Sequence, residues 1–213
     1  MIIGIPVYEG VDALDVVGPF EMFHWAGYDV RLVAETPGLV ATFTGPVLQV
    51  TGSFAQAEAF DVLWTPGGNP DALADLMEDP RRVYLDFLIR QARTATWVTS
   101  VCEGALLLAA AGLLDGYEAT THWAFIPCLR QRFPAVKIAK GHPRFVVDRN
   151  RITGGGISSG LDEALGIIQL ISGTEAAERV QATTQYFPDP PVCGAMEATT
   201  KCPVRPVVIP PPR

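Results

Sequence analysis

Residues 97–112, WVTSVCEGALLLAAAG, decide the fold of this protein. A short stretch rich in valine, threonine and tryptophan, typical of a β-strand, ends at Cys102, and a run of alanine and leucine with helix-forming composition follows at once. Cys102 is therefore predicted to lie at the turn between a strand and a helix. Gly104 beside it suits a tight elbow and leaves room for a molecule to approach the sulfur.

A cysteine at such a turn is a candidate nucleophile. The free N–H groups and the positive dipole end of the following helix are expected to lower the pKa of the Cys102 thiol and to favour the thiolate. The alternative is a small buried hydrophobic residue, because cysteine is among the most buried residue types. We favour the nucleophile because Gly104 leaves space beside the sulfur.

Strands and helices alternate along most of the chain. The predicted strands cover residues 2–8, 29–34, 61–65, 97–101, 118–121 and 136–139, two short strands lie within 145–153, and 47–51 is half of a small hairpin or an edge excursion. The predicted helices cover 18–25, opened by Gly18-Pro19, and 80–93, 103–112, 123–132, 161–172 and 174–186, the last N-capped by Thr174. This alternation predicts an α/β sandwich, with a mostly parallel sheet covered by helices on both faces.

The chain length and composition predict one domain followed by a tail. The 213 residues, 48% hydrophobic and 18% charged, fit a single soluble domain over residues 1–187. Residues 188–213 are rich in proline and show little apolar periodicity, so they are expected to form an extended arm that wraps the body or a partner subunit, or is mobile.

Charge and hydropathy limit the classes of partner. A formal net charge of −7, with no cluster of lysine and arginine, disfavours nucleic acids and anionic membranes as partners. The amino terminus resembles no signal peptide, and no stretch reaches the roughly 18 apolar residues of a membrane span. We therefore expect a cytoplasmic protein.

The four cysteines do not follow a metal-binding pattern. Cys102, Cys128, Cys193 and Cys202 form neither a C-x-x-C pair nor a zinc-ligand spacing, and the three histidines are scattered, so no metal site is predicted. Free thiols are expected in a reducing compartment, and a Cys193–Cys202 bridge only in an oxidising one.

Three predicted strand ends carry candidate site residues. Asp15, the Gly67-Gly68 pair and Cys102 each follow a strand, and open α/β sheets bind ligands beyond the carboxyl ends of their strands. Each has a structural alternative: Asp15 as a helix cap, the glycines as a simple turn.

Several motifs resemble those of a known family. They are LDVVGPFE with Asp15, PGG at 66–68, SVCEGALLLAAAGLLDG around Cys102, TTHW at 120–123 and TGGGISSGLDEAL from 153. Over residues 2 to about 191 the chain resembles the ThiJ/PfpI superfamily, most closely its isonitrile hydratase branch. The resemblance implies a flavodoxin-like, class I glutamine amidotransferase-like domain, a homodimer, and no metal or organic cofactor. It also implies Cys102 as nucleophile and Asp15 as the carboxylate facing it; Asp15 must then be partly desolvated, with a raised pKa.

The residue after the cysteine departs from the family pattern. The hydratases have Thr there and the protease-like branch has His, whereas this chain has Glu103. We expect Glu103 at the surface, where the helix dipole favours an acid in the first turn. If it faced the sulfur instead, it would raise the pKa of the thiol, or donate a hydrogen bond in its protonated form.

Two further residues are expected in the substrate pocket. His122, in TTHW, is expected to support the site without contacting the reacting atoms. Gly155, within the glycine run 154–156, admits a ligand against bare backbone or lets two chains approach closely.

The resemblance implies a lyase that hydrates a small-molecule isonitrile to an N-substituted formamide through a thioimidate on Cys102. A first alternative is another cysteine chemistry on the same scaffold, of the glyoxalase or amidase type. A second is a non-catalytic redox or ligand sensor, because the scaffold also resembles the sensory half of some transcription regulators. A regulator would need a helix-turn-helix, and the residues after 186 resemble none.

Overall fold

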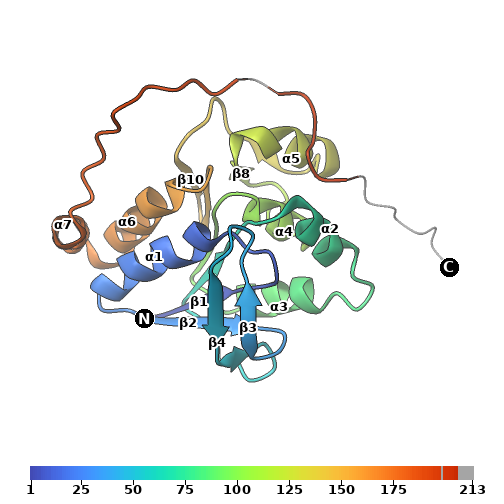
Figure 1. Ribbon diagram of the computed structural model, residues 1–213, viewed down its shortest axis with the longest axis horizontal. Coiled ribbons are helices and arrows are strands. Elements are labelled where there is room, and N and C mark those ends of the chain that lie inside the picture. Colours follow the sequence, from blue (N-terminus) through green and yellow to red (C-terminus); the bar gives the residue numbers. More distant parts are fainter. Residues whose placement is uncertain (198, 206–213) are drawn as a thin grey trace.

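The computed structural model describes residues 1–197 and 199–205. Its centre is a seven-stranded sheet in the order β10-β11-β7-β6-β1-β2-β5, in which only β10 runs antiparallel to its neighbour (Figure 1). The strands are β1 (Ile2–Pro6), β2 (Asp29–Ala34), β5 (Gly52–Ser53), β6 (Val62–Thr65), β7 (Trp97–Ser100), β10 (Phe145–Asp148) and β11 (Arg151–Gly154). The predicted mostly parallel sheet is confirmed.

Helices cover both faces of this sheet. On one face lie α1 (Ala13–Trp25), α6 (Ser159–Ser172) and α7 (Thr174–Thr184), which pack on one another (Figure 1). The other face carries α2 (Pro70–Glu78), α3 (Val83–Ala92), α4 (Gly104–Ala110) and α5 (Ile126–Arg132), the last preceded by the short 3₁₀ helix η1 (Trp123–Phe125). This is the predicted flavodoxin-like sandwich.

Two small two-stranded sheets complete the described part of the chain. The hairpin of β3 (Gly38–Ala41) and β4 (Val47–Val50) is antiparallel, so the predicted half-hairpin at 47–51 is confirmed. Strands β8 (Glu118–Ala119) and β9 (Lys137–Ile138) pair in parallel.

Some predicted element boundaries are wrong. Helix α1 begins at Ala13, with Asp12 as its N-cap, so Pro19 lies inside the helix rather than at its start. Helix α2 was not predicted, although Asn69 caps it and Pro70 stands at its first position. The N-cap position of α7 is Gly173 and not Thr174, and no side chain caps it.

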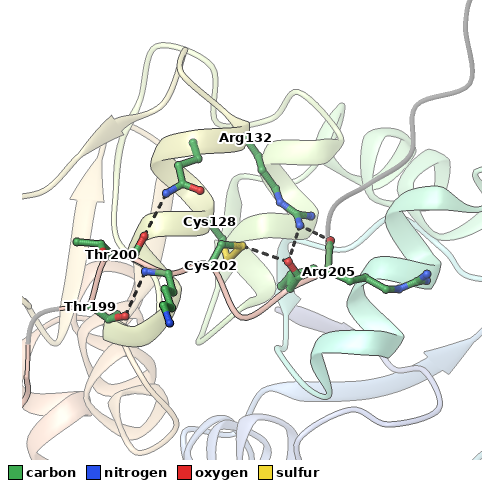
Figure 2. Close-up of a disulfide and its surroundings, with 9 residues drawn as sticks. Cys128, Arg132, Thr199, Thr200, Cys202 and Arg205 are labelled. Carbon is green, nitrogen blue, oxygen red and sulfur yellow. Dashed lines mark hydrogen bonds between the residues drawn. A yellow bond between two sulfur atoms is a disulfide. The ribbon is translucent and has the colours of Figure 1, made fainter.

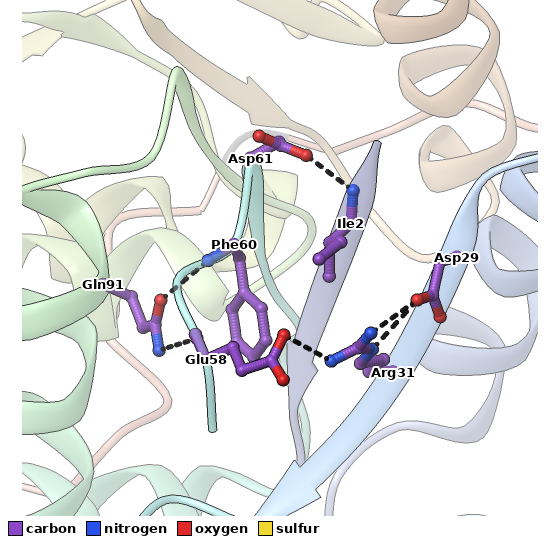
Figure 3. A network of polar contacts seen from close by, with 7 residues as sticks. All are labelled: Ile2, Asp29, Arg31, Glu58, Phe60, Asp61 and Gln91. Carbon is purple, nitrogen blue, oxygen red and sulfur yellow. Dashed lines mark hydrogen bonds and ion pairs between the residues drawn. The ribbon is translucent and has the colours of Figure 1, made fainter. Parts of the chain in front are cut away.

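Buried polar contacts join the amino ends of the central strands (Figure 3). The Ile2 N–H donates to Asp61 Oδ2 at 2.7 Å. The buried Gln91 accepts from the Phe60 N–H at 3.1 Å and donates to the Glu58 carbonyl at 2.9 Å. These bonds fix the end of the sheet that lies opposite the candidate site.

The cysteines differ from the prediction. Cys128 on α5 forms a disulfide with Cys202 of the tail, while Cys102 and Cys193 are the free cysteines of the described chain. Free thiols were expected in a reducing compartment and a Cys193–Cys202 bridge in an oxidising one; in the structure Cys202 instead pairs with Cys128. Residues 199–205 dock on α5, which brings the Cα atoms of Cys128 and Cys202 to 4.6 Å.

The tail after residue 187 contains no helix or strand over its described part, which ends at 205. Of the predicted tail 188–213, residues 198 and 206–213 lie outside the described residues. None of the described helices has the length and apolar character needed to cross a bilayer.

Candidate active site

Cys102 lies at a strained elbow between β7 and α4. Its φ of 56° is in the left-handed region, which costs a non-glycine residue about 1 kcal/mol or more. The Cys102 N–H donates to the Gly155 carbonyl at 2.8 Å, and the Thr121 hydroxyl donates to the Cys102 carbonyl at 2.7 Å. Hydrogen bonds on both sides of the residue therefore hold its backbone in the strained conformation.

Asp15 approaches from the first turn of α1. It is fully buried, its Oδ2 accepts the Gly67 N–H at 2.9 Å, and its Oδ1 has no hydrogen-bond partner among the described residues. Pro19 has no N–H to donate to the Asp15 carbonyl, which leaves this carbonyl without its helical hydrogen bond. The Trp64 Nε1–H donates to it instead, at 2.9 Å. The proline inside α1 thus frees the carbonyl through which the core tryptophan anchors Asp15.

Glu103 is buried, with 5% exposure, so its predicted surface position is wrong. One ligand atom from each of Asp15, Cys102 and Glu103 lies within 4.8 Å of the others. A Cβ added at Gly67 would lie 2.5 Å from Glu103 Oε2, and one at Gly104 would lie 2.0 Å from the Thr65 carbonyl oxygen. Close packing of the start of α4 on the end of β6 therefore places Glu103 beneath the bare backbone of Gly67.

Burial raises the pKa values of the two carboxyl groups in this cluster. Desolvation by burial and the charge of Glu103 raise the pKa of Asp15 well above its usual value, so the predicted raised pKa is confirmed. Desolvation likewise raises the pKa of Glu103 to about 7. At neutral pH Glu103 is partly ionised, and Asp15 keeps its proton to a higher pH than an ordinary aspartate.

The thiol does not follow the prediction. Burial, followed by the charges of Asp15 and Glu103, raises the pKa of Cys102, and only the Ile157 N–H, 3.5 Å from the sulfur, opposes them. The predicted lowering of this pKa by the helix is wrong, because Cys102 is 2% exposed and two carboxyl groups lie near its sulfur. Cys102 is therefore a thiol near neutral pH.

The glycines near the cluster have positioning roles. Gly67 and Gly68 were expected to orient the substrate, but their N–H groups bind Asp15 and Glu103 respectively. Gly104 was expected to leave room for an incoming molecule, and instead it allows the contact with Thr65. These three glycines fix the two carboxyl groups around the sulfur.

A cavity of about 280 Å³ lies beside the elbow, although Cys102 is not itself among its lining residues. Gly155 and Ile157, whose backbones hydrogen-bond to Cys102, belong to its wall. The cavity is lined by Leu14, Thr121, His122, Trp123, His142, Pro143, Arg144, residues 155–159 and Met196. A larger cavity of about 850 Å³ lies beside the β3–β4 hairpin, and Cys102 is not among its lining residues either.

His122 stands in the wall of the smaller cavity. Its Nδ1 accepts the Ala124 N–H at 3.2 Å, which caps η1, and burial lowers its pKa. The ring is therefore neutral with its proton on Nε2. It packs on Gly156, where a Cβ would lie 2.3 Å from the ring.

Asp15, Cys102 and Glu103 are also the one group of described residues that offers ligand atoms close enough for a metal ion. The raised pKa values of all three mean that a cation would have to displace their protons, so metal binding here would weaken as the pH falls.

Sequence reasoning missed a further carboxyl group beneath the site. Glu163 on α6 is fully buried, and neither carboxylate oxygen has a partner among the described residues. Burial, followed by the charge of Asp15, raises its pKa well above the usual value. Its helical spacing from the buried Gly160 and Ile167 was the signal that it faces the core.

The comparisons with known proteins agree with this fold. The family model described as DJ-1/PfpI matches residues 1–170. Isonitrile hydratase of Pseudomonas putida is 40% identical over 190 residues, which are 89% of this chain and 80% of that protein. The HTH-type transcriptional regulator GbdR of Pseudomonas aeruginosa is 35% identical over 105 residues, 49% of this chain and 28% of the regulator.

Solved structures give the same result. A ThiJ/PfpI family protein from Pseudomonas syringae superposes with a TM-score of 0.82 at 36% identity, over 90% of this chain and 77% of that one. DJ-1beta of Drosophila melanogaster superposes with a TM-score of 0.75 at 20% identity, over 86% of this chain and 97% of that one, a likeness of fold alone.

Proposed function

Because the chain belongs to the DJ-1/PfpI family, we propose that its buried cysteine hydrates an isonitrile to the N-substituted formamide. The observation that carries the proposal is that the elbow sulfur of Cys102 lies within 4.8 Å of two carboxyl groups of raised pKa. The 40% identity to an isonitrile hydratase supports the choice of substrate. The reaction makes the protein an enzyme of the lyase class.

In the first step the sulfur attacks the terminal carbon of the isonitrile. Glu103, partly ionised near neutral pH, accepts the thiol proton, and protonated Asp15 delivers a proton to the terminal carbon. The S–C bond forms and a thioimidate results. Asp15 is then ionised and Glu103 protonated.

Water completes the reaction. Its oxygen bonds to the thioimidate carbon, Asp15 takes one water proton, and the imine nitrogen takes the proton held by Glu103. The C–S bond then breaks, the hydroxyl proton passes to the sulfur, and the formamide leaves. Every group regains its starting protonation state, as turnover requires.

The experiment is direct. Purified protein is incubated with several isonitriles and, separately, with methylglyoxal, and products are identified by chromatography. We expect formamide from the unmodified protein and none from Cys102→Ala, which loses on the order of 1 kcal/mol of packing and stays folded by circular dichroism. Lactate without formamide would favour the glyoxalase alternative, and equal formamide from both proteins would remove Cys102 as nucleophile.

We also propose a homodimer in the cytoplasm, on the basis of the family. Leu14 and Val17 on α1 are exposed at 42% and 43%, and such side chains suit a subunit contact. Light scattering after gel filtration measures the mass, and a monomer would contradict the dimer. A reducing cytoplasm would keep Cys128 and Cys202 as free thiols, so the compartment decides whether the tail is covalently tied to α5.

A further inference from the structure

We propose that Met196 of the tail forms part of the outer wall of the cavity beside Cys102 and limits the width of the molecule admitted there, and that the Cys128–Cys202 disulfide, when it is formed, holds this wall in place. The inference rests on the proposed function in taking Cys102 as the reacting group.

The course of the tail is the first observation. After α7 the chain crosses the top of the body past the loop that precedes β10, and then descends beside α5 toward α2 (Figure 1). Met196 lies on this crossing and lines the cavity together with His122, Trp123 and Ile157. Met196 is therefore the one described residue of the tail that contributes to the cavity wall.

The anchoring of the tail is the second observation. Beyond the cavity, residues 199–205 dock on α5 and α2 (Figure 2). Besides the disulfide, Arg132 donates to the Val204 carbonyl at 2.7 Å, Val204 is 3% exposed, and Arg205 pairs with Glu78 at 3.1 Å. In contrast, no hydrogen bond joins the described residues 188–197 to the body.

The anchor limits how far the wall can move. The chain from Met196 to Cys202 spans at most about 20 Å when extended. At the other end, the tail leaves Tyr186, whose hydroxyl lies 3.3 Å from Asp162 Oδ2. With the disulfide intact, the segment 187–201 is a loop tied at both ends, so Met196 stays near the cavity.

The chemistry of the wall indicates the class of ligand. Met196, Leu14, Trp123 and Pro143 present apolar surface, and the unbranched methionine adapts to groups of different shape. The site should therefore accept a compact hydrocarbon group on the isonitrile and exclude a bulky one. Met196 is 55% exposed, so its replacement by Ala should leave the core intact.

The test measures access to the sulfur and does not depend on isonitrile hydration. Iodoacetamide and a fluorescein-bearing iodoacetamide are reacted with Cys102, and alkylation is followed by peptide mass spectrometry in a Cys193→Ser background, because Cys193 is an exposed free thiol. The quantity of interest is the ratio of the bulky to the small reagent's rate constant. In Met196→Ala we expect this ratio to rise by about ten-fold.

Opening the disulfide should have the same effect. A dithiol reductant gives two electrons and two protons to Cys128 and Cys202, and is itself oxidised to a disulfide. The Cys128→Ser/Cys202→Ser variant serves as a second route, so that a folding defect in one does not decide the result. The matched control is Val192→Ala, a tail position 77% exposed and outside the cavity wall.

The outcomes separate the proposals. A raised ratio in Met196→Ala and after reduction, with Val192→Ala unchanged, supports the wall. An unchanged ratio in Met196→Ala and after reduction overturns it, even if formamide is formed. A raised ratio in a protein that forms no formamide keeps the wall and rejects isonitrile hydration.

Discussion

At the scale of single residues, the consequence of a buried Glu103 is measurable at the neighbouring sulfur. Glu103→Gln removes a charge that helps to raise the pKa of the Cys102 thiol, so this pKa should fall and the midpoint of the alkylation profile should move to lower pH. The measurement is the alkylation rate from about pH 5 to about pH 9 in the Cys193→Ser background. Glu175→Gln, at an exposed position of α7, is the control. Superimposable profiles for Glu103→Gln and its parent would contradict a carboxylate facing the sulfur.

Glu103 also makes folding stability depend on pH. Its pKa is about 7 in the folded protein and 4.5 for an ordinary glutamate, so the native state binds more protons between these values. Stability from this group is fully present below pH 4.5 and is lost as the pH rises through 7, a total of about 3 kcal/mol. Urea unfolding measures the loss in unfolding free energy between about pH 5 and about pH 8. This loss should be smaller by about 2 kcal/mol in Glu103→Gln than in the unmodified protein. Equal drops in both proteins would count against the raised pKa.

Sequence alone predicts residues here only where a motif fixes them. Cys102 and Asp15 follow from strand ends and family motifs, and the structure brings them together. The direction of Glu103 depends on the missing side chain of Gly67 and on the contact of Gly104 with Thr65, which are distant in sequence. Glycines in a sequence indicate close approach of the backbone, but they do not predict that the side chain of Glu103 lies against Gly67.

At the scale of elements, Pro19 and Trp64 should be coupled across α1 and β6. Trp64→Phe leaves the Asp15 carbonyl unpaired and buried, at a cost of about 1–3 kcal/mol beyond the packing change. In a Pro19→Ala background the new N–H at position 19 can bond that carbonyl, so the same substitution should cost about 1 kcal/mol less. A double-mutant cycle from urea unfolding measures this difference, and strict additivity would rule out the shared carbonyl.

Glu163 on α6 gives a second prediction at this scale. Glu163→Met replaces an unpartnered buried carboxyl group by an apolar side chain of similar length, so it should stabilise the protein by about 1 kcal/mol or more. The gain should be larger at high pH, because the raised pKa of Glu163 means that stability is lost as its carboxyl group ionises. Urea midpoints at two pH values test this, and a destabilised variant would mean that the carboxyl group has a partner.

Element types were more predictable than element ends. Alternating apolar runs gave the sheet and most helices, because burial on both faces of a parallel sheet demands them. The start of α1 was missed because Pro19 resembles a first-turn proline, whereas Asp12 caps the helix. Helix α2 is short and carries a cap and a proline that also read as a loop after Gly67-Gly68.

At the scale of the whole molecule, the Cys128–Cys202 disulfide closes a large loop. The two cysteines are 74 residues apart, and closure of such a loop restricts the unfolded chain by an amount worth about 4 kcal/mol. Reduction should therefore lower the unfolding free energy of the Cys193→Ser protein by up to this amount, as measured by urea unfolding with and without a dithiol. No change on complete reduction would mean that the bridge does not contribute to stability.

At this scale, composition and length predict the sandwich and its tail but not where the tail docks. One sandwich with a proline-rich extension followed from length and patterning. The docking of the extension did not, because it depends on Val204, Arg132 and Glu78, which meet only after folding. The spacing of cysteines in the sequence therefore does not predict which cysteine pairs with Cys202.

The buried Trp64 indole has a spectroscopic consequence. Its N–H bonds the Asp15 carbonyl and is fully shielded from water, whereas Trp25 is 54% exposed and Trp97 and Trp123 are partly so. In a nitrogen-labelled sample, its side-chain resonance should be the slowest of the four tryptophans to exchange with deuterium. Its chemical shift would then report, in solution and without any added dye, each displacement of the first turn of α1 as Cys102 is alkylated.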